Sequence, residues 1–165
     1  MKAAADGAAL RADGGRALAV FRSAHRHMTE VRNTQPTIGR AGVTPLALIV
    51  DDEASIRETL RDALSEIGLD VVAVGAVRDA IQQLSRLHYD VAVVDICLPD
   101  GSGGDVIRHA LACRPPVPCV AISGIADTHT MHHCLEMGAS ACLWKPFRLE
   151  ALENIVRRLL RSSGR

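Results

Sequence analysis

Polar side chains that could do chemistry stand at the ends of four short apolar runs. Asp51 and Asp52 follow the first of them, Asp95 ends another, and Ser123 and Lys145 close the last two. An unbroken apolar run rich in β-branched residues is typical of a strand buried on both faces of a parallel sheet. Because the carboxyl ends of parallel strands meet at one edge of the sheet, we expect these five side chains to lie close together.

Three carboxylates at one edge would repel each other strongly. At a separation of ~4 Å and an effective dielectric constant near 20, each pair costs about 4 kcal/mol. Several such pairs rival the roughly 5–15 kcal/mol by which a whole domain is stable. Lys145 supplies one positive charge, and a divalent metal ion would supply the rest. Carboxylate oxygens with room for water suit Mg²⁺, or Mn²⁺, better than Zn²⁺.

Asp95 is the residue best placed to act as a nucleophile. A carboxylate beside a divalent ion and an ammonium can attack phosphorus, because the two cations neutralise the phosphoryl oxygens. The Ser123 hydroxyl offers those oxygens a hydrogen-bond donor. Of 19 basic residues only Lys2 and Lys145 are lysines. A compact ammonium therefore stands at the one place where this chemistry favours it over a planar guanidinium.

The elements that must position these residues repeat five times. Apolar runs begin near residues 46, 70, 91, 117 and 141, and apolar residues at helical spacing follow each run. This alternation predicts an α/β fold: a doubly wound, five-stranded parallel sheet with five helices. Pro99, Asp100, Gly101 and Gly103 follow the Asp95 strand and predict a sharp turn before the next helix.

Residues 1–45 differ in composition from residues 46–165 and are expected to form an N-terminal extension. The extension carries a net charge of +4 and the remainder carries −4. Its Ala, Gly and Arg content is typical of a disordered tail or linker. Apolar residues at helical spacing also allow a short amphipathic helix near 17–32, and a true start at Met28 is a third interpretation. The acidic remainder argues against nucleic acid as a direct ligand.

Cysteine content and hydropathy favour a soluble protein of a reducing compartment. The five cysteines form an odd set without a Cys-x-x-Cys pair, which favours free thiols over disulfides. No apolar run approaches the roughly 18 residues needed to span a membrane. Charged residues interrupt any secretory signal at the N-terminus. We therefore expect a cytoplasmic protein.

Four short motifs carry a resemblance to a known family. They are Ile-Val-Asp51-Asp52-Glu, Val-Val-Asp95-x-x-Leu-Pro99-Asp-Gly-x-Gly103, Ile-Ser123-Gly124 and Lys145-Pro146-Phe147. Together they resemble the receiver domain of two-component response regulators over the whole of residues 46–165. The resemblance implies a flavodoxin-like sheet with strand order 2-1-3-4-5. It also implies a protein that gains and loses its own phosphoryl group, not an enzyme with a separate substrate.

The resemblance implies roles for individual residues. Asp95 would accept a phosphoryl group from a phosphohistidine of a sensor histidine kinase or a histidine phosphotransfer protein. Asp52 and Asp95 would bind Mg²⁺ together with the backbone carbonyl of Cys97, and Asp51 would assist through water. The residues implied to hold the phosphoryl oxygens are Ser123 and Lys145. The signal would pass to a downstream protein target.

The sequence departs from the family pattern at one position. The family has an aromatic residue, usually Tyr or Phe, three positions before the lysine, and it turns inward when the Ser or Thr hydroxyl moves toward the phosphate. Here that position holds Cys142. Trp144 shares the strand face of Cys142 and is interpreted either as a partner-binding anchor or as a core residue. The histidine-rich run 129–134 is better interpreted as a solvated helix face than as a metal site.

Two other functions stay open. A Mg²⁺-dependent phosphohydrolase of the haloacid-dehalogenase type needs Asp-x-Asp after the first strand, but Glu53 and Ala54 follow Asp52 here and leave no second Asp at the required spacing. A receiver-like interaction module that does not use phosphorylation is the other. The chain ends soon after the last expected helix, so we expect a stand-alone receiver or a phosphorelay intermediate.

Overall fold

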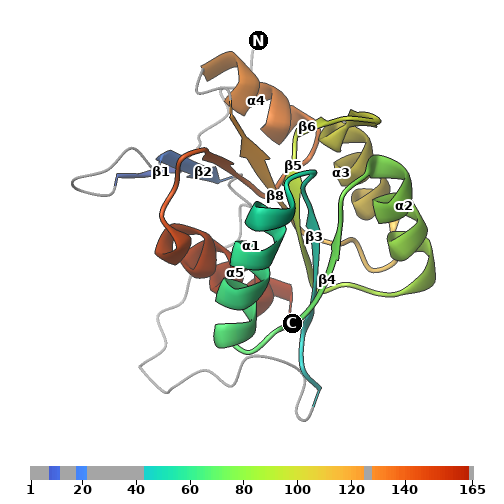
Figure 1. Ribbon diagram of the computed structural model, residues 1–165. Coiled ribbons are helices and arrows are strands. Elements are labelled where there is room, and N and C mark those ends of the chain that lie inside the picture. The colour runs from blue at the N-terminus through green and yellow to red at the C-terminus, as the bar shows by residue number, and fades with distance from the viewer. Residues whose placement is uncertain (1–7, 12–17, 22–42, 125–127, 164–165) are drawn as a thin grey trace.

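Five parallel strands form one continuous part of the main sheet, with β4 at its edge (Figure 1). In spatial order they are β4 (Asp70–Val74), β3 (Leu46–Val50), β5 (Val91–Asp95), β8 (Cys119–Ser123) and β9 (Ala141–Trp144). Each pairs with its neighbours in parallel register. Numbered along the chain, these five strands have the order 2-1-3-4-5, which confirms the flavodoxin-like topology. The computed structural model describes residues 8–11, 18–21, 43–124 and 128–163.

Five helices cover the two faces of the sheet. One face carries α1 (Ala54–Glu66) and α5 (Leu149–Ser163), and the other carries α2 (Val77–Arg86), α3 (Gly103–Ala112) and α4 (Thr128–Glu136) (Figure 1). Two separate apolar clusters, one on each face, reflect this division. Among the described residues, no helix combines the length and the apolar character that crossing a bilayer requires.

Strand β5 lies at the centre of both clusters. Val91 and Val93 pack on the α1 and α5 side, whereas Ala92 and Val94 pack on the α2 and α3 side. Successive side chains of a strand point to opposite faces, so a strand covered on both faces must be apolar at every position. This is why the run shows no alternation, and why Asp95 is held at the end of a rigid, buried strand.

Strand β8 starts later than the sequence indicated. The apolar run begins at Val117, but the strand begins at Cys119. Pro118 has no N–H to give to a sheet, although its carbonyl oxygen still accepts a hydrogen bond from the N–H of Ala92 at 2.9 Å. The proline thus delays the start of the strand and leaves its carboxyl end in place.

Two N-terminal strands extend the sheet beyond β9. Strands β1 (Ala8–Arg11) and β2 (Leu18–Phe21) pair antiparallel, and β2 pairs antiparallel with β9, with Val20 opposite Cys142. This excludes a helix over Leu18–Phe21, part of the segment 17–32 where a short helix was considered. The edge of β9 offers unpaired backbone groups, and a segment containing Val and Phe favours a strand. The rest of that segment lies outside the described residues, and the division near residue 45 stays a prediction.

Candidate acidic cation and phosphoryl site

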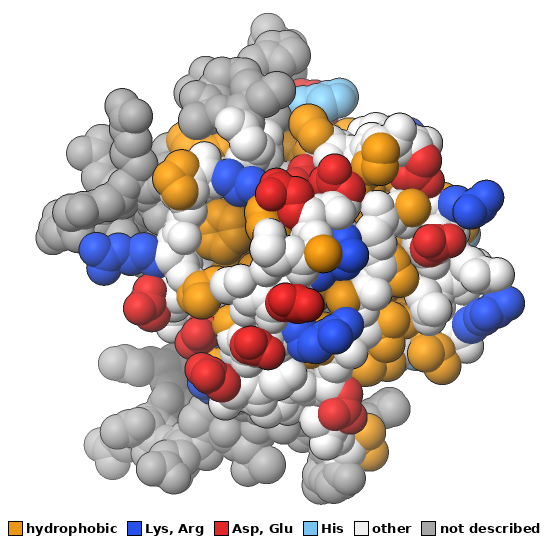
Figure 2. All heavy atoms as spheres, viewed as in Figure 1, with side chains coloured by type: hydrophobic (Ala, Val, Ile, Leu, Met, Phe, Trp, Pro, Cys, Tyr) orange, Lys and Arg blue, Asp and Glu red, His pale blue; other side chains and the backbone are white. Residues whose placement is uncertain are grey.

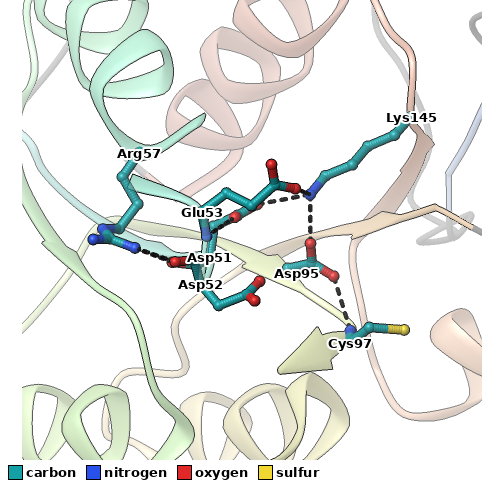
Figure 3. A network of polar contacts seen from close by, with 7 residues as sticks. All are labelled: Asp51, Asp52, Glu53, Arg57, Asp95, Cys97 and Lys145. Atoms are coloured by element: carbon teal, nitrogen blue, oxygen red, sulfur yellow. Dashed lines mark hydrogen bonds and ion pairs between the residues drawn. The ribbon is translucent and has the colours of Figure 1, made fainter. Parts of the chain in front are cut away.

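The ammonium of Lys145 joins two buried carboxylates at the carboxyl edge of the sheet (Figure 3). Its Nζ donates to Asp95 Oδ2 at 2.5 Å and to Asp51 Oδ2 at 2.9 Å, and lies 3.9 Å from Glu53 Oε1. Asp51 is 1% exposed and Asp95 5% exposed. The chain therefore brings together Asp95 at the end of β5 and the residues that directly follow β3 and β9, as the positions at the strand ends predicted.

The loop after β5 fixes the other oxygen of Asp95. The N–H of Cys97 donates to Asp95 Oδ1 at 2.8 Å. Cys97 begins a small hairpin of β6 (Cys97–Leu98) and β7 (Gly101–Ser102), where the sequence predicted only a turn. At Gly103 a Cβ atom would lie 2.0 Å from the carbonyl oxygen of Asp95. Only glycine allows this loop to fold back so closely beneath the carboxylate.

The β3–α1 loop directs Asp51 and Asp52 differently. Asp51 Oδ1 accepts a hydrogen bond from the N–H of Glu53 at 2.9 Å, so the carboxylate of Asp51 is held on both sides. Asp52 is exposed, and its side chain extends toward Asp95 (Figure 3). Nη1 of Arg57, in the first turn of α1, donates to the backbone carbonyl oxygens of both aspartates, at 2.7 and 2.8 Å.

The three aspartates form a group that fits a divalent cation. Asp51, Asp52 and Asp95 each offer one carboxylate oxygen, and the three atoms lie within 4.8 Å of one another. Three negative charges and the one ammonium of Lys145 leave a net charge of −2. Figure 2 shows acidic side chains gathered above the start of α1, beside a basic side chain. An all-oxygen donor set that is partly open to solvent suits Mg²⁺ or Mn²⁺.

The pKa of Lys145 is raised by its surroundings. Burial acts to lower this pKa, but the hydrogen bonds to Asp95 and Asp51 and the charges of those carboxylates outweigh the burial. The group is therefore an ammonium at neutral pH, held between two anions. An incoming phosphoryl group could attract it away from Asp95.

Ser123 is completely buried at the end of β8, the strand beside β5. Its carbonyl oxygen accepts a hydrogen bond from the N–H of Lys145 at 2.8 Å, so the two residues are tied at the backbone. The structure thus places Ser123 at the same edge as the aspartates. The role of its hydroxyl, like that of the Cys97 carbonyl, stays a prediction.

Sequence reasoning placed Asp100 in the turn after Asp95 but missed its contact with the start of α2. Both of its carboxylate oxygens accept hydrogen bonds from the start of that helix, from Val77 N at 2.8 Å and Arg78 N at 3.1 Å. Ala76, at the cap position, has no side chain that could do this. Asp100, Glu53 and Arg57 stand within or next to the recognised motifs, but the motif patterns do not specify their contacts.

Cys142, the one departure from the family pattern, and Trp144 lie on the α4 side of β9. Cys142 is buried and packs with Cys134 of α4, and Trp144 joins the same apolar cluster, as their shared strand face predicted. Trp144 is half-buried. In the histidine-rich run, His132 and His133 are exposed whereas Cys134 is fully buried, so these side chains do not point to a common centre.

The fold and the acidic edge define the class: a flavodoxin-like α/β domain with a candidate cation site at the carboxyl ends of its strands. Residues 47–157 match the response regulator receiver domain family, and the chain belongs to that family.

Curated relatives and a solved structure support this assignment. The response regulator protein PilR of Pseudomonas aeruginosa is 36% identical over 115 residues, which cover 70% of this chain and 26% of PilR. The two-component response regulator PhoP of the same species is 35% identical over 117 residues, covering 71% of this chain and 52% of PhoP. The chain thus spans about a quarter to a half of these relatives.

The receiver domain of a sensor histidine kinase of Pseudomonas aeruginosa superposes with a TM-score of 0.66 and 26% identity. The match covers 72% of this chain and 99% of that one. A magnesium ion is coordinated in the active-site cleft of that protein.

Proposed function

We propose that this chain is a phosphoacceptor receiver in which Asp95 takes a phosphoryl group with the help of Mg²⁺. The observation that carries the proposal is the contact of Lys145 with Asp95 and Asp51, beside a third carboxylate from Asp52. A buried carboxylate, an ammonium and an all-oxygen cation site are the parts that phosphoryl transfer to an acidic side chain requires.

The residues of the chain would act as follows. An oxygen of Asp95 attacks phosphorus as the bond to the donor nitrogen breaks, and the donor imidazole leaves with that electron pair. Lys145 moves from the carboxylate to a phosphoryl oxygen, and Ser123 donates its hydroxyl hydrogen to another. Because Cys97 N–H and Lys145 already hold both oxygens of Asp95, the nucleophile is oriented before the donor arrives.

The same residues would hold the metal ion. Its ligands would be the carboxylates of Asp52 and Asp95 and the carbonyl oxygen of Cys97, with Asp51 acting through water. When bound, Mg²⁺ neutralises charge that develops on the phosphoryl oxygens. Mn²⁺ meets the same requirements for ligand type. The net charge of −2 of the three aspartates and Lys145 supports a divalent ion.

The proposal extends to partners and setting. The donor would be the phosphohistidine of a sensor histidine kinase or a histidine phosphotransfer protein, and the recipient of the signal would be a protein. We propose no direct nucleic-acid ligand, no separate substrate and a cytoplasmic setting. Residues 1–45 would be an extension to the receiver domain at 46–165. Membership of the receiver family and the response-regulator relatives support these partners.

The test is intact-mass analysis after incubation with a small-molecule phosphodonor. Wild type with Mg²⁺ should gain a labile adduct of about 80 Da, the mass of one phosphoryl group. Asp95→Asn should gain none. Asp62→Asn is the matched control, because Asp62 is an exposed carboxylate on α1, outside the acidic cluster.

Three results would contradict the proposal. An adduct of equal yield in Asp95→Asn would move the phosphorylated residue elsewhere. Failure of wild type to gain the adduct, together with partner binding unchanged by a phosphoryl mimic, would favour an interaction module that does not use phosphorylation. Multiple turnover of generic phosphate esters would instead favour a phosphohydrolase.

A further inference from the structure

We infer that Arg57 is a positioning residue for the metal site: it holds the backbone of the β3–α1 loop so that the carboxylates of Asp51 and Asp52 converge with that of Asp95. This inference rests on the proposed function, because it concerns the same Mg²⁺ site. Arg57 does not reach the site itself. Its only contacts to the two aspartates among the described residues are to their main-chain oxygens.

The contacts of Arg57 are short and specific. A single nitrogen, Nη1, donates to the carbonyl oxygen of Asp51 at 2.7 Å and to that of Asp52 at 2.8 Å. Hydrogen bonds from a charged donor are shorter and stronger than neutral ones. The side chain is half-buried, so solvent competes only partly for its guanidinium. The two carbonyl groups are thereby held toward the same point.

Apart from Arg57, the loop is held through the Asp51 carboxylate, which accepts hydrogen bonds from the Glu53 N–H and from Lys145 Nζ, and through one main-chain contact to the sheet. The N–H of Asp51 makes a bond to β4, to Val74 O at 3.2 Å, and beyond this residue the chain leaves the sheet. Helix α1 follows at once, yet Glu53 at its cap position makes no side-chain capping bond, and the first turn has no acidic residue. Arg57 instead anchors the loop from within the helix, by donating to the carbonyl groups of the two residues that precede the cap position.

Gly75 lies beside the Arg57 guanidinium and the carbonyl group of Asp51. A Cβ atom at position 75 would lie 3.3 Å from Arg57 Nη1 and 3.8 Å from the carbonyl oxygen of Asp51. The absence of a side chain there leaves room for the guanidinium beside the loop. A methyl group at this position would press on the guanidinium while leaving its charge in the molecule.

Figure 3 shows the consequence for the site. Arg57 lies on the far side of the Asp51–Asp52 backbone from Lys145, and the aspartate side chains point away from it toward Asp95. Fixing two successive carbonyl groups fixes the peptide plane between them and the Cα atoms on either side. The hydrogen bonds of Arg57 thus help to set the separation of the carboxylate oxygens, as in metal sites whose ligands are oriented by hydrogen bonds from outside the ligand set.

A positioning role and a pure charge effect predict opposite changes in Mg²⁺ affinity when Arg57 is replaced. If the positive charge of Arg57 acted only through space, its removal would strengthen Mg²⁺ binding, because one repelling cation would be gone. If Arg57 positions the ligands, Arg57→Gln should raise the dissociation constant for Mg²⁺ roughly tenfold, the lower end of the effect known for groups that orient metal ligands. Arg57→Lys keeps the charge and one donor, and should fall between wild type and Arg57→Gln.

The experiment measures Mg²⁺ affinity of the full chain by calorimetry and Mn²⁺ affinity by electron paramagnetic resonance, beside thermal unfolding. Arg61→Gln is the matched control, because Arg61 is an exposed arginine one turn further along α1 and should leave affinity within a factor of two. If Arg57→Gln does not fold, Gly75→Ala is the second variant, and we expect it to weaken Mg²⁺ binding in the same direction but by less, because its added Cβ would displace the guanidinium only slightly.

Each outcome decides the inference. Weaker Mg²⁺ binding in Arg57→Gln or Gly75→Ala, with Arg61→Gln like wild type, supports it. Affinity unchanged or increased in folded Arg57→Gln overturns it, even if wild type is phosphorylated on Asp95. Failure of the proposed function is distinguishable, because wild type itself would then bind no Mg²⁺ and gain no adduct.

Discussion

Replacing Lys145 by methionine should destabilise the fold when Mg²⁺ is absent. Its Nζ lies 2.5 Å from an oxygen of Asp95 and 2.9 Å from one of Asp51. With an effective dielectric constant near 20, each contact represents about 6 kcal/mol of gross attraction. Desolvation offsets much of this, and removing one partner from a buried ion pair costs about 3–5 kcal/mol. Because the lysine side chain is 22% exposed, we expect a loss near the lower end of that range.

Mg²⁺ should recover most of this loss. Without Lys145 the three aspartates carry a charge of −3 in place of −2, so the variant should bind Mg²⁺ more tightly than wild type does. A ligand at a hundred times its dissociation constant adds about 2.7 kcal/mol to the free energy of unfolding. Methionine keeps the unbranched shape of lysine, which limits packing effects.

The assay is urea unfolding followed by circular dichroism, in chelator and in saturating Mg²⁺. Arg61→Met, on the exposed side of α1, is the control for loss of a surface cation and should change stability little in either condition. The electrostatic reasoning is refuted if Lys145→Met is as stable as wild type in chelator. It is equally refuted if Mg²⁺ stabilises the variant less than it stabilises wild type.

Two further predictions concern the loop that follows Asp95. Gly103→Ala should lower the free energy of unfolding, measured in urea, by about 3 kcal/mol, because its Cβ would overlap main-chain atoms of Asp95 and Ile96 that cannot rotate away. Gly124→Ala has open space around it and should cost far less. Similar losses in both variants would disprove the steric argument. Asp100→Asn should lose stability at neutral pH, because the Val77 and Arg78 N–H groups lower the pKa of the Asp100 carboxyl below 3.8. The contribution of this carboxylate to stability is full above that value and is lost as pH falls through the folded-state pKa. The free energies of unfolding of wild type and variant, measured between pH 3 and 7, should therefore approach each other only in acid. A difference that does not depend on pH would exclude the charge as its cause.

The sequence predicted the fold because two strong patterns agree along the chain. The apolar run of β5 must be covered on both faces, and four more runs repeat it at intervals that leave room for a helix. The same logic brought Lys145 to Asp51, 94 positions away, because both stand at carboxyl ends of strands in one sheet. Contacts that follow from strand order can be predicted at any sequence distance.

Contacts that depend on the path of a loop could not be predicted. Asp100 reaches the start of α2, 23 residues away, because the β6–β7 hairpin turns it in that direction. Arg57 looks like any arginine in a first helical turn until the carbonyl groups of Asp51 and Asp52 are seen to face it. Strand β2 was missed because an exposed sheet edge, not the segment's own spacing, supplies its hydrogen-bond partners.

Cys142 changes how a phosphoryl signal could leave the site. The contact with the Cys134 thiol raises the pKa of Cys142, and burial raises it further, so this residue stays an uncharged thiol packed under α4. It has no ring that could turn inward.

Trp144 lies on the same strand face and stands opposite Ser123 in the β8–β9 pairing. Its indole Nε1 is buried and, within the described part of the chain, has no hydrogen-bond partner. A buried donor without an acceptor is costly, so a movement that gives this N–H a partner is favoured. We therefore expect that a displacement of Ser123 toward a phosphoryl group would reach Trp144, its neighbour in the strand pairing, before it reaches position 142.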